Sequence, residues 1–219
     1  MITLYDYELS AECYQARLML SILGLQHDCV DVEFYPSREH ESEWFTELSP
    51  LHRLPVLQDG ATTLHDAQAI LVYLAAQHDA SGRWYPTGDA TLLAEITQWL
   101  GFARAFAASA GAARLHETFF QPADIEAARA QAHQMLRVLD DHLWFGEYEA
   151  RSWLCNADQP TIADIALFPD TALSEEGGIP RMDYPAVRRW TDRVKRINGF
   201  ITMSGIFPAG PAQAESCTA

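Results

Sequence analysis

The sequence has no long hydrophobic run, no cluster of basic residues and no paired cysteines. No apolar stretch reaches the roughly 18 residues that a membrane-spanning helix needs, which argues against a membrane protein. The opening segment, Met1 to Glu8, carries acidic side chains where a secretory signal would be basic, so a cytoplasmic location is expected. The four cysteines form no CxxC motif and are expected to be reduced thiols.

Basic residues are scarce in this chain. Fifteen Lys and Arg stand against 30 Asp and Glu, which gives a formal net charge of −15. Such a surface repels phosphate backbones and anionic lipids, so neither nucleic acid nor a membrane is an expected partner. The eight histidines show no HExxH or other ligand spacing, and no metal is expected. The overall balance, with 48% hydrophobic residues, is typical of a globular protein.

The first 78 residues alternate between strand and helix patterns. The elements predicted there are a strand at 2–7, a helix at 13–23, a strand at 29–32, strands at 54–57 and 62–64, and a helix at 66–77. The first three form a βαβ unit, which favours parallel strands, and the two later strands form a hairpin around Asp59-Gly60. The order therefore predicts an α/β domain of the βαβ-ββα type over residues 1–78.

The remainder of the chain is expected to be helical. Turn residues at 79–89 predict a linker, and apolar stripes within 92–103 and 125–143 predict two long helices packed as an antiparallel hairpin. Shorter helices are predicted at about 161–173 and 185–197. Together these make an all-helical C-terminal domain at 90–207, followed by a tail at 208–219 that is expected to be flexible.

Four motifs, taken in order, resemble the glutathione S-transferase family and cover residues 1 to about 207. They are Tyr5-Asp-Tyr-Glu-Leu-Ser-Ala-Glu-Cys-Tyr, Ser49-Pro-Leu-His-Arg-Leu-Pro-Val-Leu, Leu64-His-Asp-Ala-Gln-Ala-Ile-Leu-Val-Tyr-Leu and Pro160-Thr-Ile-Ala-Asp-Ile-Ala. The resemblance is closest to bacterial members of the serine-type lineage. It implies a thioredoxin-like N-terminal domain, an all-α C-terminal domain, glutathione as cosubstrate, a small electrophile as second substrate, a C2 homodimer and a role in detoxification.

A glutathione transferase must hold a thiol, whose free pKa is about 8.5, as a thiolate. By resemblance, the stabilising hydroxyl falls at Ser10, just before the first helix, where the helix N-terminus also favours negative charge. The alternative is that Ser10 only caps that helix. Cys13 is a rival, because a thiol in the first helical turn has a lowered pKa and some bacterial members use a cysteine near there for mixed disulfides with glutathione. Tyr5 and Tyr7, on the first strand, could offer phenolic hydroxyls, but strand aromatics are more often core, and they are interpreted as core residues.

The resemblance also assigns residues that hold the tripeptide. The Leu54 backbone would pair with its cysteinyl part beside a cis peptide at Pro55. Asp66 and Ala67, at a helix N-terminus, would receive the γ-glutamyl carboxylate. Ala67 replaces a serine of the family pattern, which removes a hydrogen bond of about 0.5 to 1.5 kcal/mol.

The loops near this site offer cations for the glycyl carboxylate. Arg53 is the first candidate, with Arg38 and His40 as alternatives, because a guanidinium suits bidentate carboxylate recognition. Glu12 departs from the family pattern, and its carboxylate would oppose a thiolate beside it. Thr161 to Asp164 is a helix-capping pattern and is placed outside the active site.

Three functions are compatible with this pattern. The leading hypothesis is conjugation of glutathione to an electrophile that enters a pocket lined by Tyr14, Phe102 and Phe106. A second is a glutathione-dependent disulfide reductase that uses Cys13. A third is a binding protein that has kept the fold and lost the chemistry, for which Ala67 and Glu12 are the supporting features.

Overall fold

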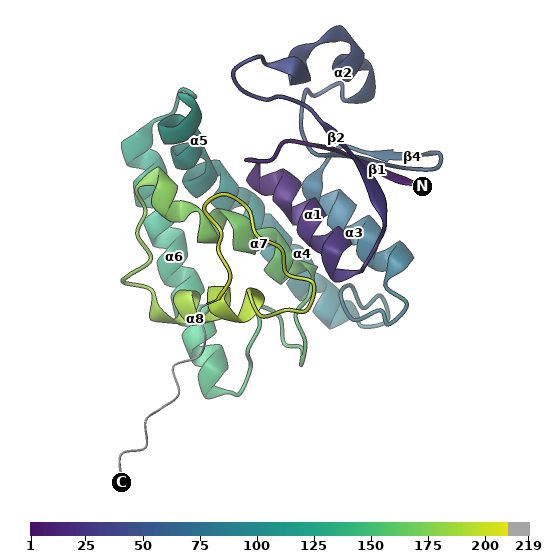
Figure 1. The fold of residues 1–219 in the computed structure, drawn as a ribbon. Helices are drawn as coiled ribbons and strands as arrows, with labels where there is room; N and C mark the ends of the chain where they lie inside the picture. The colour runs from purple at the N-terminus through teal and green to yellow at the C-terminus, as the bar shows by residue number, and fades with distance from the viewer. Residues whose placement is uncertain (210–219) are drawn as a thin grey trace.

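The computed structural model describes residues 1–209 as a small α/β part followed by a larger helical part (Figure 1). The elements of the first part are β1 (Ile2–Asp6), α1 (Ala11–Ile22), β2 (His27–Asp31), η1 (Glu39–Glu41), α2 (Glu43–Leu48), β3 (Val56–Asp59), β4 (Thr62–Leu64) and α3 (Ala67–His78). Those of the second are α4 (Ala90–Phe106), η2 (Ala107–Gly111), α5 (Ala112–Phe119), α6 (Ile125–Tyr148), α7 (Ile162–Ala172), η3 (Ser174–Gly177) and α8 (Pro185–Val194). This order confirms the predicted fold class.

A four-stranded sheet in the order β2-β1-β3-β4 organises the first part. β1 runs parallel to β2 and antiparallel to β3, so Leu4 lies opposite both Cys29 and Leu57. β3 and β4 form the predicted hairpin, and Gly60 at its turn has φ 59°, a left-handed conformation that glycine adopts at little cost. The parallel pair and the hairpin together give the thioredoxin-like arrangement that the sequence predicts.

Helices α1 and α3 lie side by side between the sheet and the helical part (Figure 1). Each begins at a side-chain cap: Ser10 Oγ accepts the Cys13 N–H at 3.2 Å, and Asp66 Oδ1 accepts the Ala69 N–H at 3.0 Å. Such caps satisfy N–H groups that have no partner within the helix. They fix where both helices start, and therefore where their N-terminal turns face.

The two long helical segments form the predicted antiparallel hairpin, but the first is longer than its apolar stripe. The helix continues from α4 through the π-helical η2 into α5. Paired contacts run in opposite directions along the two segments, from Glu117 with Arg129, through Ser109 with Met135, to Trp99 with His142. The small residues at 107–113 carry no amphipathic pattern, so the sequence did not predict this extension.

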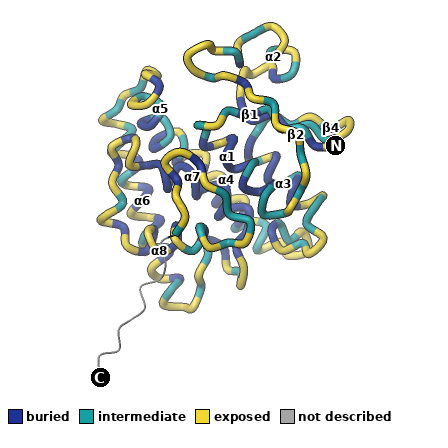
Figure 2. Tube along the Cα trace, viewed as in Figure 1, coloured by how far each residue is buried: buried dark blue, intermediate teal, exposed yellow. Residues whose placement is uncertain are grey.

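The core is continuous between the two parts. The Tyr14 ring is fully buried and lies 6.3 Å from the ring of Phe168 in α7, and its hydroxyl donates to Ile201 O at 2.6 Å. Figure 2 shows the buried residues concentrated along α1, α3 and α7, with exposed residues around α2. α1 and α3 therefore pack against the helical part through α7.

The segment predicted as a linker, 79–89, is anchored to the core. Trp84 is buried, its N–H donates to Asp79 Oδ2 at 3.0 Å, and its carbonyl accepts the Ile162 N–H at 3.0 Å. The domain boundaries drawn from the sequence stay predictions. Residues 210–219, most of the predicted tail, lie outside the described part of the chain. Among residues 1–209, no helix combines the length and apolarity required of a membrane span.

Candidate functional site

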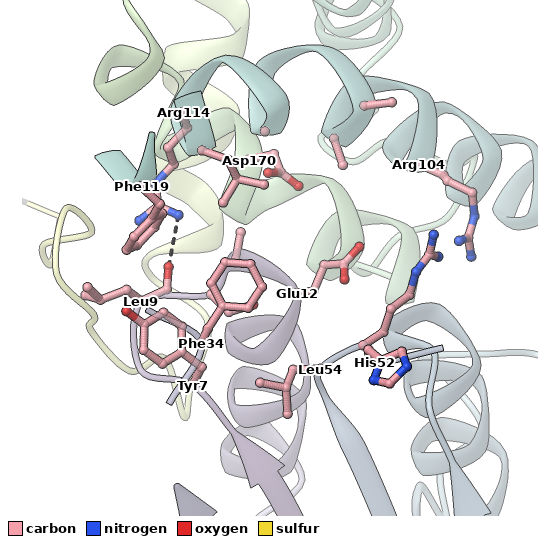
Figure 3. A pocket seen from close by; sticks show the side chains of 17 residues that line it. Tyr7, Leu9, Glu12, Phe34, His52, Leu54, Arg104, Arg114, Phe119 and Asp170 are labelled. Atoms are coloured by element: carbon pink, nitrogen blue, oxygen red, sulfur yellow. Dashed lines mark hydrogen bonds between the residues drawn. The ribbon is translucent and has the colours of Figure 1, made fainter. Parts of the chain in front are cut away.

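A cavity of about 410 Å³ lies between the N-terminal end of α1 and the helices of the second part (Figure 3). The α/β part contributes Tyr7, Ser10, Glu12, Phe34, Arg53 and Leu54 to its wall. The helical part contributes Arg104, Ala107, Gly111, Arg114, Phe119 and Asp170. A second, small cavity adjoins it, because Glu12, Arg104 and Ala107 line both. Asp66, Ala67 and Gln68 line the small cavity, so the N-terminal turns of α1 and α3 border two adjacent cavities.

Ser10 lies where both of the roles that the sequence left open can be met by one side chain. It is the N-cap of α1, and it also lines the large cavity. Its Oγ accepts a hydrogen bond from the Cys13 N–H, which leaves the hydroxyl hydrogen able to donate elsewhere. The partial positive charge of the α1 N-terminus adds to the preference for an anion at this point. A capping role and a role toward a thiolate are therefore compatible in one side chain.

Cys13 lies outside both cavities. Its side chain is fully buried beneath the sheet with Val32, Phe45, Leu54 and Val56, and its Sγ accepts the Tyr7 N–H at 3.4 Å. Burial, together with the negative charge of Asp6, raises the pKa of the thiol, and the Ser10 hydroxyl and the Tyr7 N–H oppose this effect only partly. This direction is opposite to the lowered pKa that the first-turn position suggested. The buried thiol offers no reactive sulfur to the cavity.

The loop before β3 places a main-chain segment at the cavity. The Leu54–Pro55 peptide is cis, as the sequence predicted, and the Tyr35–Pro36 peptide is cis as well. Leu54 lines the cavity, and no residue within 1–209 hydrogen-bonds its N–H or C=O. Both groups are therefore available to a ligand that lies along the loop before β3.

Three cations were predicted as partners for a carboxylate, and they have different surroundings. Arg53 is exposed, lines the cavity and forms no ion pair with any residue in 1–209. Arg38 is engaged by Glu41, and His40 is buried against the Phe34 ring at a centroid distance of 4.4 Å. Burial lowers the pKa of His40, which disfavours its charged form. Of these three predicted cations, Arg53 is the one that lines the cavity.

Asp66, the predicted γ-glutamyl contact, is tied to the helical part. Arg104 Nη2 donates to Asp66 Oδ2 at 2.9 Å and to Gln68 Oε1 at 3.2 Å. Burial opposes ionisation of Asp66, but the Ala69 N–H and Arg104 outweigh it and hold the pKa of this carboxyl below its usual value. Asp66 is therefore a carboxylate, and its neighbour Ala67 offers a backbone N–H at the start of α3.

Two carboxyl groups face the large cavity from opposite sides. Figure 3 shows the side chains of Glu12, from α1, and Asp170, from α7, directed into the same space. Burial and the nearby Asp66 raise the pKa of Glu12, while Arg53 and Arg104 act against this. Burial and Glu12 raise the pKa of Asp170 to about 7, with Arg114 acting against it. The sequence did not single out Asp170.

Part of the cavity wall is aromatic, where Tyr7, Phe34 and Phe119 line it. The Tyr7 ring lies 5.9 Å from Phe34 and 6.0 Å from Phe119, and Tyr35 contacts Phe119 at 5.8 Å. The residues predicted for a second-substrate pocket, Tyr14, Phe102 and Phe106, do not line it: Tyr14 and Phe106 are fully buried in the core, and Phe102 packs on Trp99. Tyr7, predicted to be core, lies in the wall instead.

The residues that the sequence missed come mainly from the helical part. Arg104, on α4, and Arg114, on α5, reach the site only when the helical part packs against the α/β part, and no local pattern distinguishes them from surface arginines. Arg114 is buried, donating to Glu176 Oε2 at 2.6 Å and to Leu9 O at 2.9 Å. Asp170 could have been identified from the sequence, because an acidic residue inside the largely apolar helical segment 162–172 is unusual.

One group of metal-ligand types occurs among the described residues, away from the cavities. Atoms of Asp6, Cys29 and Asp31 lie within 4.8 Å of one another. The Asp6 carboxylate is already paired with Arg17 Nη1 at 2.5 Å, which occupies it with a cation. Burial and the charges of Asp6 and Asp31 raise the pKa of the Cys29 thiol to about 11, which disfavours the thiolate that a metal would require.

Comparison with known proteins agrees with this architecture. The profile "Glutathione S-transferase, N-terminal domain" matches residues 4–82, and the profile "Glutathione S-transferase, C-terminal domain" matches residues 122–193. The chain belongs to the glutathione S-transferase family. Membership supports a glutathione-dependent transferase function in general terms.

Relatives and solved structures resemble the chain over most of its length. Glutathione S-transferase verG of Clonostachys rogersoniana is 26% identical over 83% of this chain and 78% of its own. The glutathione S-transferase-like protein tpcF of Aspergillus fumigatus is 29% identical over 89% and 92%. The structure of a possible glutathione S-transferase from Rhodopseudomonas palustris is 28% identical, with a TM-score of 0.81, and covers 92% of this chain and 97% of that one.

Proposed function

We propose that this protein is a glutathione transferase that binds glutathione between α1, the Leu54 loop and α3, and directs its thiolate at a small electrophile in the aromatic half of the large cavity. Ser10 stabilises the thiolate, the Leu54 backbone pairs with the cysteinyl unit, and Ala67 and Asp66 meet the γ-glutamyl end. Arg53 pairs with the glycyl carboxylate. The proposal extends to a C2 homodimer, a cytoplasmic location and a role in detoxification.

The observation that carries the proposal is the position of Ser10 on the same cavity as the unpaired Leu54 backbone. A hydroxyl that donates to a thiolate contributes about 1.5 to 3 kcal/mol, which is equivalent to about one to two pK units. A helix N-terminus adds about 0.3 to 1 kcal/mol. Together they are large enough to bring a thiol pKa of about 8.5 to near neutrality.

The two competing hypotheses have less support. A disulfide reductase would need a reactive sulfur at the cavity, and Cys13 is buried away from it with a raised pKa. A binding protein without chemistry is favoured by Glu12, whose carboxylate faces the cavity, and by the missing hydroxyl at Ala67. Arg53 and Arg104 partly offset the negative charge of Glu12, so the charge of the cavity wall still allows an anion to bind.

Titration calorimetry with reduced glutathione tests the binding step, and rates with chlorodinitrobenzene test the chemistry. We expect saturable binding, and a fall in the conjugation rate of about 10-fold to 100-fold in Ser10→Ala, matching the lost hydrogen bond. The pH at which the bound thiol ionises should rise in the same variant.

A control separates the thiolate role from the cap. Glycine is a tolerable N-cap and costs only a few tenths of a kcal/mol, so Ser10→Gly should keep most of the stability and still lose the rate. An undiminished rate in both Ser10 variants would refute the role of Ser10. If Tyr7→Phe were the variant that lost activity, the phenol in the cavity wall would take that role.

A further inference from the structure

Asp170 is a buried acid that the proposed thiolate chemistry does not use. Its residue exposure is 5%, and no residue within 1–209 donates a hydrogen bond to its carboxyl group. Its oxygen atoms are not fully enclosed, because they are reached from the cavity, but a carboxyl group on so largely buried a residue is costly to ionise. Its side chain points into the large cavity from α7 (Figure 3). A ligand in the cavity would supply the missing partner.

The backbone around Asp170 leaves room for this carboxyl group. A Cβ on Gly111 would lie 2.9 Å from Asp170 Oδ1, closer than side-chain atoms approach in folded proteins. Gly111 ends the π-helical segment η2, which bulges at the point where the continuous helix passes α7. π-bulges inside helices are frequent at functional sites. The glycine thus keeps the carboxyl free at the cavity.

Burial and the charges around Asp170 keep a substantial fraction of its carboxyl group protonated near neutral pH. Glu12, on α1, faces it across the cavity, and Arg114, on α5, is the cation that acts on it. Arg114 is already committed to Glu176 on η3 and to Leu9 O, so it does not neutralise Asp170 fully. The other titratable or cationic groups on the cavity wall are Tyr7, His52, Arg53 and Arg104. Burial and Glu12 bring the pKa of Asp170 to about 7.

We propose that Asp170 is a proton donor to the second substrate, and that the cavity accordingly favours electrophiles whose attack by a thiolate leaves negative charge on oxygen, such as α,β-unsaturated ketones. This inference rests on the proposed glutathione transferase function. The aromatic wall formed by Tyr7, Phe34 and Phe119 suits the apolar, planar part of such a compound. Asp170 is the polar group that would meet its oxygen.

The step balances without a further reagent. The thiolate sulfur attacks the β-carbon and forms the C–S bond, and the electron pair of the C=C bond moves to the carbonyl oxygen as an enolate. The Asp170 carboxyl gives its proton to that oxygen, and the enol then tautomerises to the ketone. The Asp170 carboxylate regains a proton from water, which replaces the one that glutathione released on ionising. General acid catalysis of this kind contributes about 100-fold to 10,000-fold.

Two substrates separate this role from a structural one. Chlorodinitrobenzene loses chloride and needs no proton, whereas benzylideneacetone, an α,β-unsaturated ketone, needs one. Asp170→Asn should lower the ratio of the ketone rate to the aryl chloride rate at least about tenfold. Gly111→Ala should lower the same ratio, because it displaces the carboxyl group. The exposed Asp158, away from both cavities, gives the matched control Asp158→Asn, which should leave the ratio unchanged.

The pH profile supplies the second readout. The wild-type ketone rate should fall as pH rises past about 7, and Asp170→Asn should lose this descending limb. A ratio unchanged in Asp170→Asn, or a parallel loss of both rates at every pH, would overturn the proton-donor role while leaving the transferase function standing. Absence of conjugation with both substrates in the wild type would overturn the proposed function, and the role of Asp170 with it.

Discussion

At the scale of single residues, two side chains of the cavity contrast: Ser10 has a local structural role, and Asp170 has none. Ser10 is ordinary as an N-cap, but it lies where a ligand's anion would sit. Asp170 has neither a cap nor an ion pair within hydrogen-bonding distance in residues 1–209, and the fold bears the cost of burying it. The helix cap accounts for Ser10 locally, whereas only the cavity that it faces accounts for Asp170.

The state of Asp170 predicts how stability depends on pH. Its pKa is raised from 3.8 to about 7 in the folded protein, so between these values the folded state binds more protons than the unfolded state and stability falls as pH rises. Asp170→Asn removes this dependence, and it should therefore raise the melting temperature more at pH 8 than at pH 5. Thermal unfolding followed by circular dichroism at both pH values measures the difference.

The control for this experiment is again Asp158→Asn, whose effect on the melting temperature should be the same at both pH values. An equal effect of Asp170→Asn at pH 5 and pH 8 would mean that the folded protein leaves the ionisation of Asp170 unchanged. The measurement needs no substrate, so it is independent of any activity.

At the scale of elements, one carboxylate organises the packing of α7 against α8 and the loop before it. Asp164 is fully buried and accepts hydrogen bonds from the Thr161 N–H at 2.9 Å, the Leu154 N–H at 3.2 Å and Trp190 Nε1 at 2.9 Å. The first of these completes the capping box that the sequence predicts at the start of α7. The other two come from outside the helix and join three segments at one side chain.

Asp164→Ala should destabilise the fold severely. It leaves three buried donors without an acceptor, and each such group costs about 1 to 3 kcal/mol, so a loss of about 3 kcal/mol or more is expected. Urea unfolding monitored by tryptophan fluorescence gives the free energy. The exposed Asp158→Ala should change it by less than about 0.5 kcal/mol. A small effect of Asp164→Ala would show that water replaces the lost oxygens.

We expect the contact of Arg104, on α4, with Asp66, at the start of α3, to affect glutathione binding more than it affects the stability of the fold. Arg104 and Asp66 form an ion pair with side-chain exposures of 54% and 40%, and exposed pairs contribute about 0 to 1 kcal/mol. Arg104→Gln should therefore barely change the free energy of unfolding. It should weaken glutathione binding about threefold to tenfold, because Asp66 and Glu12 are left near the ligand with one cation fewer.

Calorimetric titration of Arg104→Gln with glutathione checks this prediction. Arg188→Gln is a suitable control, since Arg188 is exposed on α8 and lines neither cavity. Binding at wild-type affinity in Arg104→Gln would mean that Arg104 only bridges two helices.

At the scale of the whole molecule, the proposed assembly can be measured directly. Sedimentation at micromolar concentration should give a particle of twice the 24.5 kDa chain mass. Because the chain carries a net charge of −15, two copies repel each other, and low salt should weaken the dimer while added salt screens the repulsion. A single species of one chain mass across salt concentrations would contradict the homodimer.

Local patterns were sufficient for most of the fold. Apolar periodicity and turn residues predicted the order of the strands along the chain, the parallel pair, the hairpin and the main helices, with end points displaced by a few residues. They missed α2, which is too short for a helical period, and α5, which follows a run of small residues. A very short helix, and one that directly follows a run of small residues, are hard to delimit from the local pattern alone, because contacts distant in sequence contribute to their structure.

For the site, the sequence by itself determined the groups whose position depends on the chain nearby: the Ser10 cap, the cis peptide at Pro55, and the start of α3 at Asp66. The tertiary structure decided which side chains face them. Packing within the α/β part buried Cys13, while docking of α7 and the α4–α5 helix buried Tyr14 and Phe106 and brought Arg104 and Asp170 to the cavity wall. A cap is a bond within one turn, whereas a cavity between layers exists only once both layers have packed.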